Sequence, residues 1–106
     1  MDLQSNYHQE TRTLLIKLSG RFGYESHASF QTAYTEKAIS EIDNIVLDLS
    51  DVDYLDASAL GMLLLLKDHA GDHADISIIN CQEDVYKVFE VASLNLLFQI
   101  IRKRLN

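Results

Sequence analysis

Proline is absent from this 106-residue chain, glycine occurs only four times and cysteine only once. The chain therefore has no obvious linker, internal repeat or low-complexity segment, and its length fits one domain over residues 1–106. The single Cys81 excludes an internal disulfide, is compatible with a reducing cytoplasm and is expected to be a buried, small apolar residue. We expect one cytoplasmic domain that buries a core without covalent staples.

Membrane-directing segments and an excess of positive charge are also missing. No N-terminal segment combines basic residues with an apolar core, so no signal peptide is predicted. The apolar run Leu60–Leu66 is far shorter than the roughly 20 residues that a membrane-spanning helix needs. Sixteen acidic residues against nine basic ones give a formal net charge of -7. This balance argues against a nucleic-acid partner, which requires a basic face.

The hydrophobic pattern predicts strands that alternate with helices. The predicted strands are a weak one at Leu3–His8, one around Leu14, Ile16 and Leu18, then Asn44–Leu49, Asp75–Asn80 and Leu97–Ile101. The predicted helices are Ser26–Ala38, Ser58–Ala70 and Gln82–Val91, with a turn at Gly20–Gly23 and a helix stop at Gly71. This order indicates an α/β domain with a mixed sheet of four to five strands and three to four helices.

The most informative stretch is Asp-Ala-Ser-Ala-Leu-Gly at Asp56 to Gly61. It follows a buried strand and a carboxylate-rich connection, and it leads into the predicted helix that Ser58 begins. Unpaired N–H groups and the macrodipole favour an anion such as a phosphate at a helix N-terminus. Ser58 is therefore a candidate phosphorylation site. The alternative is a simple N-cap, and the two roles are compatible because a hydroxyl can cap in one state and carry phosphate in another.

The same region is acidic, and the helix after it is apolar on more than one face. No lysine or arginine lies between Lys37 and Lys67, whereas six carboxylates do: Glu41, Asp43, Asp48, Asp51, Asp53 and Asp56. These carboxylates either form a solvated surface or favour a basic partner surface. Burial explains most of the apolar helix. The surplus around Met62 and Leu66 is a candidate for exposed contact with a partner, to which a flexible methionine adapts well.

The element order and the Asp56–Gly61 motif resemble the STAS domain of anti-sigma-factor antagonists, over about Thr11 to Ile101. In that family the motif reads Asp-Ser-Ser-Gly-Leu-Gly. Its second serine is phosphorylated by a partner kinase that also serves as the anti-sigma factor. The matching position here is Ser58, and the family's aspartate matches Asp56.

The resemblance implies a non-enzymatic, cytoplasmic partner switch that needs no cofactor. Unphosphorylated, it would bind an anti-sigma factor or a serine kinase of the histidine-kinase-like ATPase type. Phosphorylation would release that partner, and a serine phosphatase would reset the switch. The residues expected to contact the partner are Asp53, Asp56, Ala57, Ser58, Ala59 and Met62.

The chain departs from the family pattern in four places. Ala57 replaces the first serine and leaves one hydroxyl to modify, while Ala59 replaces a glycine and stiffens the loop-to-helix junction. Gly23 replaces the usual acidic residue after a Gly-x-Leu-like turn. The chain also stops soon after the last predicted strand, so the family's final helix is missing or vestigial.

Other functions fit the sequence less well. A phosphoaspartate receiver would use Asp48 at the end of a buried strand, but an acidic pair for Mg²⁺ and a lysine ending the last strand are lacking. A STAS subunit of a transporter-associated complex would keep the fold without using the serine. His69 and His73 have metal-ligand spacing, yet Gly71 lies between them and no third ligand follows at convincing spacing, so no metal site is expected.

Overall fold

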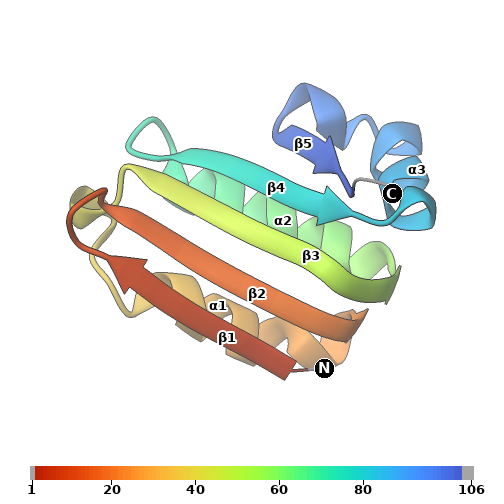
Figure 1. Ribbon diagram of the computed structural model, residues 1–106, viewed down its shortest axis with the longest axis horizontal. Helices are drawn as coiled ribbons and strands as arrows, with labels where there is room; N and C mark the ends of the chain where they lie inside the picture. Colours follow the sequence, from red (N-terminus) through yellow and green to blue (C-terminus); the bar gives the residue numbers. More distant parts are fainter. Residues whose placement is uncertain (1, 104–106) are drawn as a thin grey trace.

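Five strands and three α-helices make up the fold in the computed structural model, which describes residues 2–103 (Figure 1). The strands are β1 (Asp2–His8), β2 (Thr13–Phe22), β3 (Asn44–Leu55), β4 (Asp75–Cys81) and β5 (Gln99–Arg102). The helices are α1 (His27–Thr35), α2 (Ala57–Ala70) and α3 (Glu83–Val91), with short 3-10 turns η1 (Tyr24–Ser26), η2 (Ile39–Glu41) and η3 (Leu94–Leu96). The predicted α/β class and the predicted order of strands and helices are confirmed.

The strands lie in the sheet in the same order as in the chain, β1-β2-β3-β4-β5. β1 is antiparallel to β2, and the remaining neighbours are parallel. Parallel neighbours need crossover connections, which α1, α2 and α3 supply. Figure 1 shows α1 and α2 on the same face of the sheet, behind β1 to β4, and α3 near β4 and β5.

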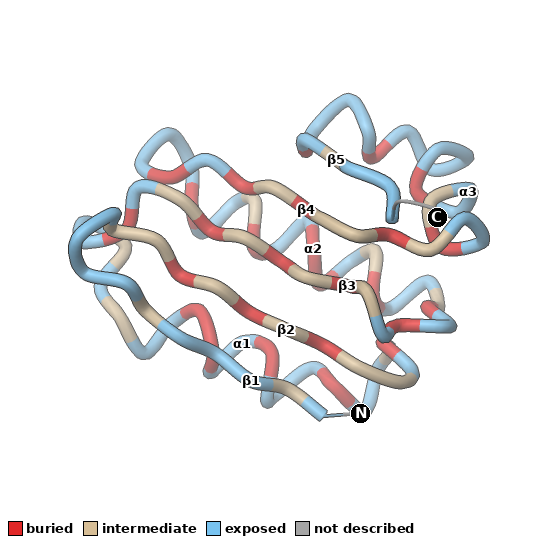
Figure 2. Tube along the Cα trace, in the orientation of Figure 1, coloured by how far each residue is buried: buried red, intermediate tan, exposed pale blue. Residues whose placement is uncertain are grey.

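The core lies between the sheet and these helices. Alternate residues of the central strands are buried on this face (Figure 2), because successive side chains of a strand point to opposite sides. An aromatic row extends the core from the end of β2 across α1. The Phe22 and Phe30 rings lie 5.2 Å apart, and those of Phe30 and Tyr34 lie 5.5 Å apart. This row anchors the end of β2 that leads to the candidate site.

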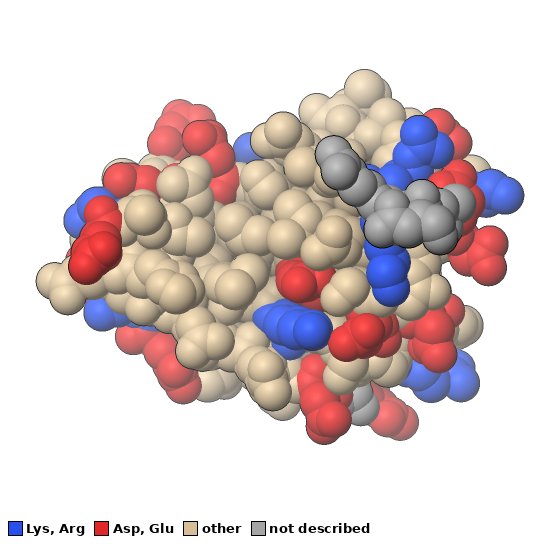
Figure 3. Space-filling model, in the orientation of Figure 1, with Lys and Arg blue, Asp and Glu red and all other residues tan. Residues whose placement is uncertain are grey.

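The opposite face of the sheet carries no described helix. Its residues are the half-buried members of the alternation, such as Leu15, Val46 and Ile79. Figure 3 views this face and shows a broad area of neutral side chains, with acidic and basic groups near its middle as well as at its margins. The two faces of the sheet therefore differ: one is packed against helices, and the other is open.

Two strands are longer than the sequence predicted. The predicted turn at Gly20–Gly23 is wrong, because β2 continues to Phe22 through a bulge at Gly20, whose φ of 84° suits glycine. The acidic connection after Asn44–Leu49 is also strand, since β3 continues to Leu55. Buried positions Leu49 and Val52 are three residues apart, and this irregularity interrupts the period of two that marks a strand.

Other local expectations meet mixed outcomes. α1 ends at Thr35 instead of Ala38, whereas Gly71 directly follows α2 as predicted. Up to Lys103 no helix follows β5, and residues 104–106 lie outside the described part of the chain. Cys81 is buried, as expected, and burial raises the pKa of its thiol to about 12. Within residues 2–103, no helix is both long and apolar enough to span a membrane.

Candidate functional site

The beginning of α2 is fixed by Asp56. This residue follows β3 in extended backbone conformation, and its Oδ1 accepts a hydrogen bond from the Ala59 N–H at 3.0 Å. Its own N–H donates to the Phe22 carbonyl at 3.3 Å, which joins the start of the helix to the end of β2. Asp56 is therefore the N-cap, and its carboxylate adds to the bond that the Ala59 N–H also donates to the Asp56 carbonyl oxygen at 3.1 Å.

The expectation that Ser58 begins the helix and acts as its N-cap is wrong. Asp56 occupies the cap position because the helix starts directly after β3, with Ala57 as its first residue. Ser58 is the second residue, and it is exposed, as is Ala57. Its hydroxyl is thus available at the positive end of a 14-residue helix without being required to hold that helix together.

This assignment predicts which residue stabilises the helix. Asp56→Ala should lower the free energy of unfolding by about 0.5 to 2 kcal/mol, because the capping acceptor is lost. Ser58→Ala should change it by less than about 0.5 kcal/mol, as is typical of an exposed position. Denaturant melts of both variants and the unsubstituted protein measure these values. A larger loss in Ser58→Ala than in Asp56→Ala would contradict the assignment of the cap.

The predicted exposure of Met62 and Leu66 is also wrong. Both side chains lie in the core, with Met62 only 4% exposed, and Ala59 is fully buried beside them. The leucines that α2 exposes are Leu64 and Leu65, at 45% and 52%. The sequence run is apolar throughout, so it does not indicate which residues face the sheet.

One exposed stripe of α2 runs from its N-terminus along the helix. Gly61 lies at the centre of this stripe, because residues three and four apart share a helix face. Ser58 and Leu65 flank Gly61 on one side, and Ala57 and Leu64 flank it on the other. The structure therefore places the predicted Ala57 and Ser58 on a surface with Leu64 and Leu65, while the predicted Ala59 and Met62 lie beneath it.

Three of the six acidic residues between Lys37 and Lys67 form ion pairs. Asp43 pairs with Arg12 at 3.1 Å, Asp51 with Lys17 at 3.5 Å and Glu41 with Lys37 at 3.8 Å. Among residues 2–103, Asp53 and Asp56 have no such ion pair. Asp53 is exposed on β3 near its end, and Asp56 is half-buried. Asp56, two residues before Ser58, is thus a carboxylate without an ion pair at the start of α2.

The receiver alternative assumed that Asp48 ends its strand, and the structure shows that it does not. It lies inside β3, which continues to Leu55. Burial raises its pKa, but hydrogen bonds from the Ser50 N–H at 2.9 Å and from the Asn80 amide, together with the charge of Lys17, leave the pKa below its ordinary value. In the described part of the chain, no three His, Cys, Asp or Glu side chains come together as a metal site.

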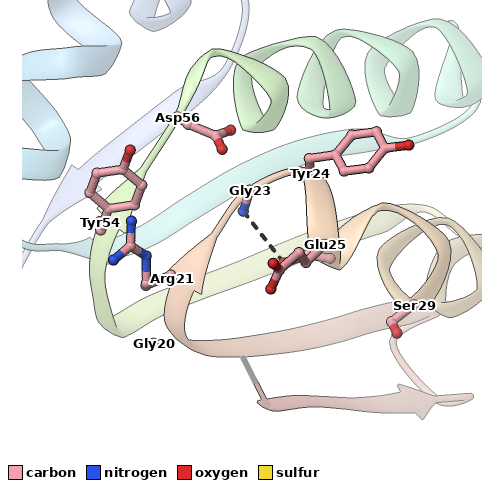
Figure 4. A pocket seen from close by; sticks show the side chains of 9 residues that line it. Gly20, Arg21, Gly23, Tyr24, Glu25, Ser29, Tyr54 and Asp56 are labelled. Atoms are coloured by element: carbon pink, nitrogen blue, oxygen red, sulfur yellow. Dashed lines mark hydrogen bonds between the residues drawn. The ribbon is translucent and has the colours of Figure 1, made fainter.

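A hollow lies beside Asp56, and sequence reasoning did not find it (Figure 4). The Arg21 guanidinium covers the Tyr54 ring at 4.2 Å from its centroid, and Tyr24 is exposed on the η1 side. The residues that line the hollow are Gly20, Arg21, Gly23, Tyr24, Glu25, Ser26, Ser29, Tyr54 and Asp56. Tyr54 and Arg21 were missed because their segments were assigned to a loop and a turn, although they face each other as strand neighbours.

Comparisons with known proteins identify the family of the chain. Residues 5–101 match the family model described as "Mlab, STAS domain". A STAS-domain containing protein of Pseudomonas aeruginosa strain UCBPP-PA14 is 46% identical over 88 residues, which cover 82% of this chain and 86% of that protein.

Solved structures of anti-sigma factor antagonists share the fold. One from Mycobacterium paratuberculosis has a TM-score of 0.78 at 14% identity, covering 94% of this chain and 86% of its own. Unphosphorylated SpoIIAA has a TM-score of 0.73 at 15% identity, covering 98% and 90%. Phosphorylated SpoIIAA of Bacillus has a TM-score of 0.64 at 17% identity, covering 93% and 90%. At these identities the likeness shows a shared fold and no more.

Proposed function

Because the chain belongs to the STAS domain family, we propose that it is an anti-sigma-factor antagonist that exchanges partners through phosphorylation of Ser58. Unphosphorylated, it binds an anti-sigma factor or a serine kinase of the histidine-kinase-like ATPase type, and phosphorylation releases that partner. A serine phosphatase restores the binding form. The activity is binding and not catalysis. It takes place in the cytoplasm, where a kinase finds ATP.

The observation that carries this proposal is the exposed Ser58 hydroxyl in the first turn of α2, two residues after the capping Asp56. A phosphate there carries about -1.5 to -2 charges at pH 7. The positive end of the helix offsets part of this charge, by about 0.3 to 1 kcal/mol. The fold can therefore accept the modification, because Asp56 and not Ser58 caps the helix.

The partner surface that we propose is the exposed stripe of α2 around Gly61. A Cβ at position 61 would meet no protein atom within 4 Å, so nothing inside the domain requires glycine there. Glycine in a helix interior costs about 0.5 to 1 kcal/mol relative to alanine. Close approach of a partner to the helix backbone is a reason to keep it. The exposed Leu64 and Leu65 beside Gly61 supply apolar area for the same contact.

Phosphorylation changes this surface by charge. Asp56 already lies two residues before Ser58 without an ion pair among the described residues, so the phosphate adds to an existing negative charge. A partner that matches the unphosphorylated surface would have to desolvate this charge on binding. Since about 1.4 kcal/mol changes affinity tenfold, a modest penalty is enough to exchange partners.

The test is to map the phosphate on protein isolated from its own cells. We expect a single phosphate on Ser58 and none on Ser26, Ser29 or Ser50. Ser26 is only 3% exposed and Ser50 is half-buried in β3, whereas Ser29 is exposed on α1 but lies outside the motif. Intact mass followed by peptide sequencing measures the number and position. A phosphate mapped only to another residue, under every growth condition, would remove Ser58 from the mechanism.

A further inference from the structure

Gly23 lies between β2 and η1, against the carboxylate of Asp56 (Figure 4). Its φ of -158° and ψ of -161° describe extended backbone that any residue adopts, so conformation does not require glycine. Space does. A Cβ at position 23 would lie 3.2 Å from Oδ1 of Asp56, 3.0 Å from its Cγ and closer still to its Oδ2. Any side chain at this position would therefore displace the carboxylate.

Neither residue can easily move aside to make room. The Asp56 N–H is hydrogen-bonded to the Phe22 carbonyl, which holds the Asp56 backbone against the end of β2. Gly23 is held on its other side by Ser26, whose N–H donates to the Gly23 carbonyl at 2.8 Å and whose Oγ accepts from the Gly23 N–H at 3.4 Å. Ser26 is itself buried. A Cβ at position 23 would thus turn the carboxylate away from the Ala59 N–H.

We propose that Gly23 is a positioning residue for the Ser58 site. The missing side chain at position 23 lets the Asp56 carboxylate lie over the first turn of α2, and this cap fixes the start of the helix on which Ser58 is the second residue. Gly23 therefore acts through Asp56 and does not itself touch a partner. The effect on Ser58 phosphorylation rests on the function proposed above, whereas the effect on the helix start does not.

A double-substitution cycle tests the link between the two residues. Hydrogen exchange of the Ala59 amide is measured in Gly23→Ala, Asp56→Ala and the combination of both. In Gly23→Ala we expect exchange about tenfold faster than in the unsubstituted protein, the factor that corresponds to about 1.4 kcal/mol, within the range for loss of an N-cap. In the Asp56→Ala background, adding Gly23→Ala should change it less than about twofold, because no carboxylate remains to displace.

Gly61→Ala is the matched control, because it adds the same methyl group where nothing lies within 4 Å. It should leave the Ala59 amide protected. Asp56→Ser is the rescue variant, since a serine also caps but its side chain is shorter. Gly23→Ala combined with Asp56→Ser should exchange at the rate of Asp56→Ser alone. Equal acceleration by Gly23→Ala with and without the Asp56 carboxylate would overturn the proposal, as would an Ala59 amide still protected in Gly23→Ala.

The same variants connect the helix start to phosphorylation. Intact mass of protein from its own cells should show a lower phosphorylated fraction in Gly23→Ala than in the unsubstituted protein, and recovery in Gly23→Ala combined with Asp56→Ser. A Gly23→Ala protein that loses the Ala59 protection but keeps the full phosphorylated fraction would contradict a role for Gly23 at Ser58. If the unsubstituted protein carries no phosphate on Ser58, the proposed function fails, while the exchange cycle still decides whether Gly23 positions Asp56.

Discussion

We expect Ser58→Ala to bind the regulator about as tightly as the unphosphorylated protein, and Ser58→Asp to bind it at least about tenfold more weakly. Alanine removes one exposed hydroxyl and cannot acquire a charge. Aspartate adds a carboxylate to the first turn of α2, two residues after the capping Asp56, on a surface that the partner must desolvate. The large difference between two small side chains is what identifies a switch controlled by charge.

The measurement begins with Ser58→Ala as bait, because this variant cannot be released by phosphorylation. The protein captured from its own cells is then purified and titrated calorimetrically with both variants. Melts of the two variants serve as the control for folding, and both should unfold within about 0.5 kcal/mol of the parent. Equal affinities would mean that Ser58 is structural. Retained binding by Ser58→Asp would favour the STAS subunit of a transporter-associated complex instead.

The second large effect is a contrast between substitutions on the exposed side and on the buried side of α2. Leu65→Asp should weaken partner binding by about 2 kcal/mol or more, roughly thirtyfold, because a charge would replace apolar contact in the proposed interface. Since the side chain is 52% exposed, stability should change by less than about 0.5 kcal/mol. Met62→Ala should instead affect stability much more than partner binding, because its side chain lies in the core. It should lower the free energy of unfolding by about 2 to 5 kcal/mol, because it leaves a cavity in the core.

Denaturant melts and partner titration of both variants decide this prediction. Gln9→Asp is a charge-matched control, since it adds one carboxylate to the exposed turn between β1 and β2, at the other end of β2 from the site. It should alter neither stability nor affinity. Full affinity in Leu65→Asp would show that the partner contacts another face of the domain and would require the interface on α2 to be abandoned.

Hydrophobic periodicity predicted the fold well and its boundaries poorly. The alternation around Leu14, Ile16 and Leu18 and the helical spacing in α1 and α3 are intact, so their element types could be assigned. The ends of β2 and β3 were missed for a physical reason. Both strands are irregular near the site, through the bulge at Gly20 and the three-residue step from Leu49 to Val52. Irregular strands keep their pairing but lose the period by which a sequence reveals them.

The sequence predicted a helix start close to Asp56, but it did not predict the roles of the residues there. Aspartate and serine are almost equally good N-caps, so the identity of the cap depends on where β3 ends, which the pattern did not show. The exposed side of α2 was hidden by the run Leu60–Leu66. Counting back from the polar Asp68 in steps of three and four gives Leu65, Leu64 and Gly61, and this signal was available. The role of Gly23 depends on a tertiary contact with Asp56, 33 positions along the chain, and periodicity cannot reveal such a contact.

The arrangement of the sheet has a kinetic consequence. Because the strands lie in chain order, each strand pairs with its nearest neighbour in sequence, and every pairing closes a loop of limited length. The chain also contains no proline, so its refolding includes no slow wait for an X-Pro bond to isomerise. Under the proposed function, newly synthesised protein would be ready to bind its partner as soon as the sheet has assembled. The supply of binding-competent protein would then follow synthesis without a lag of minutes.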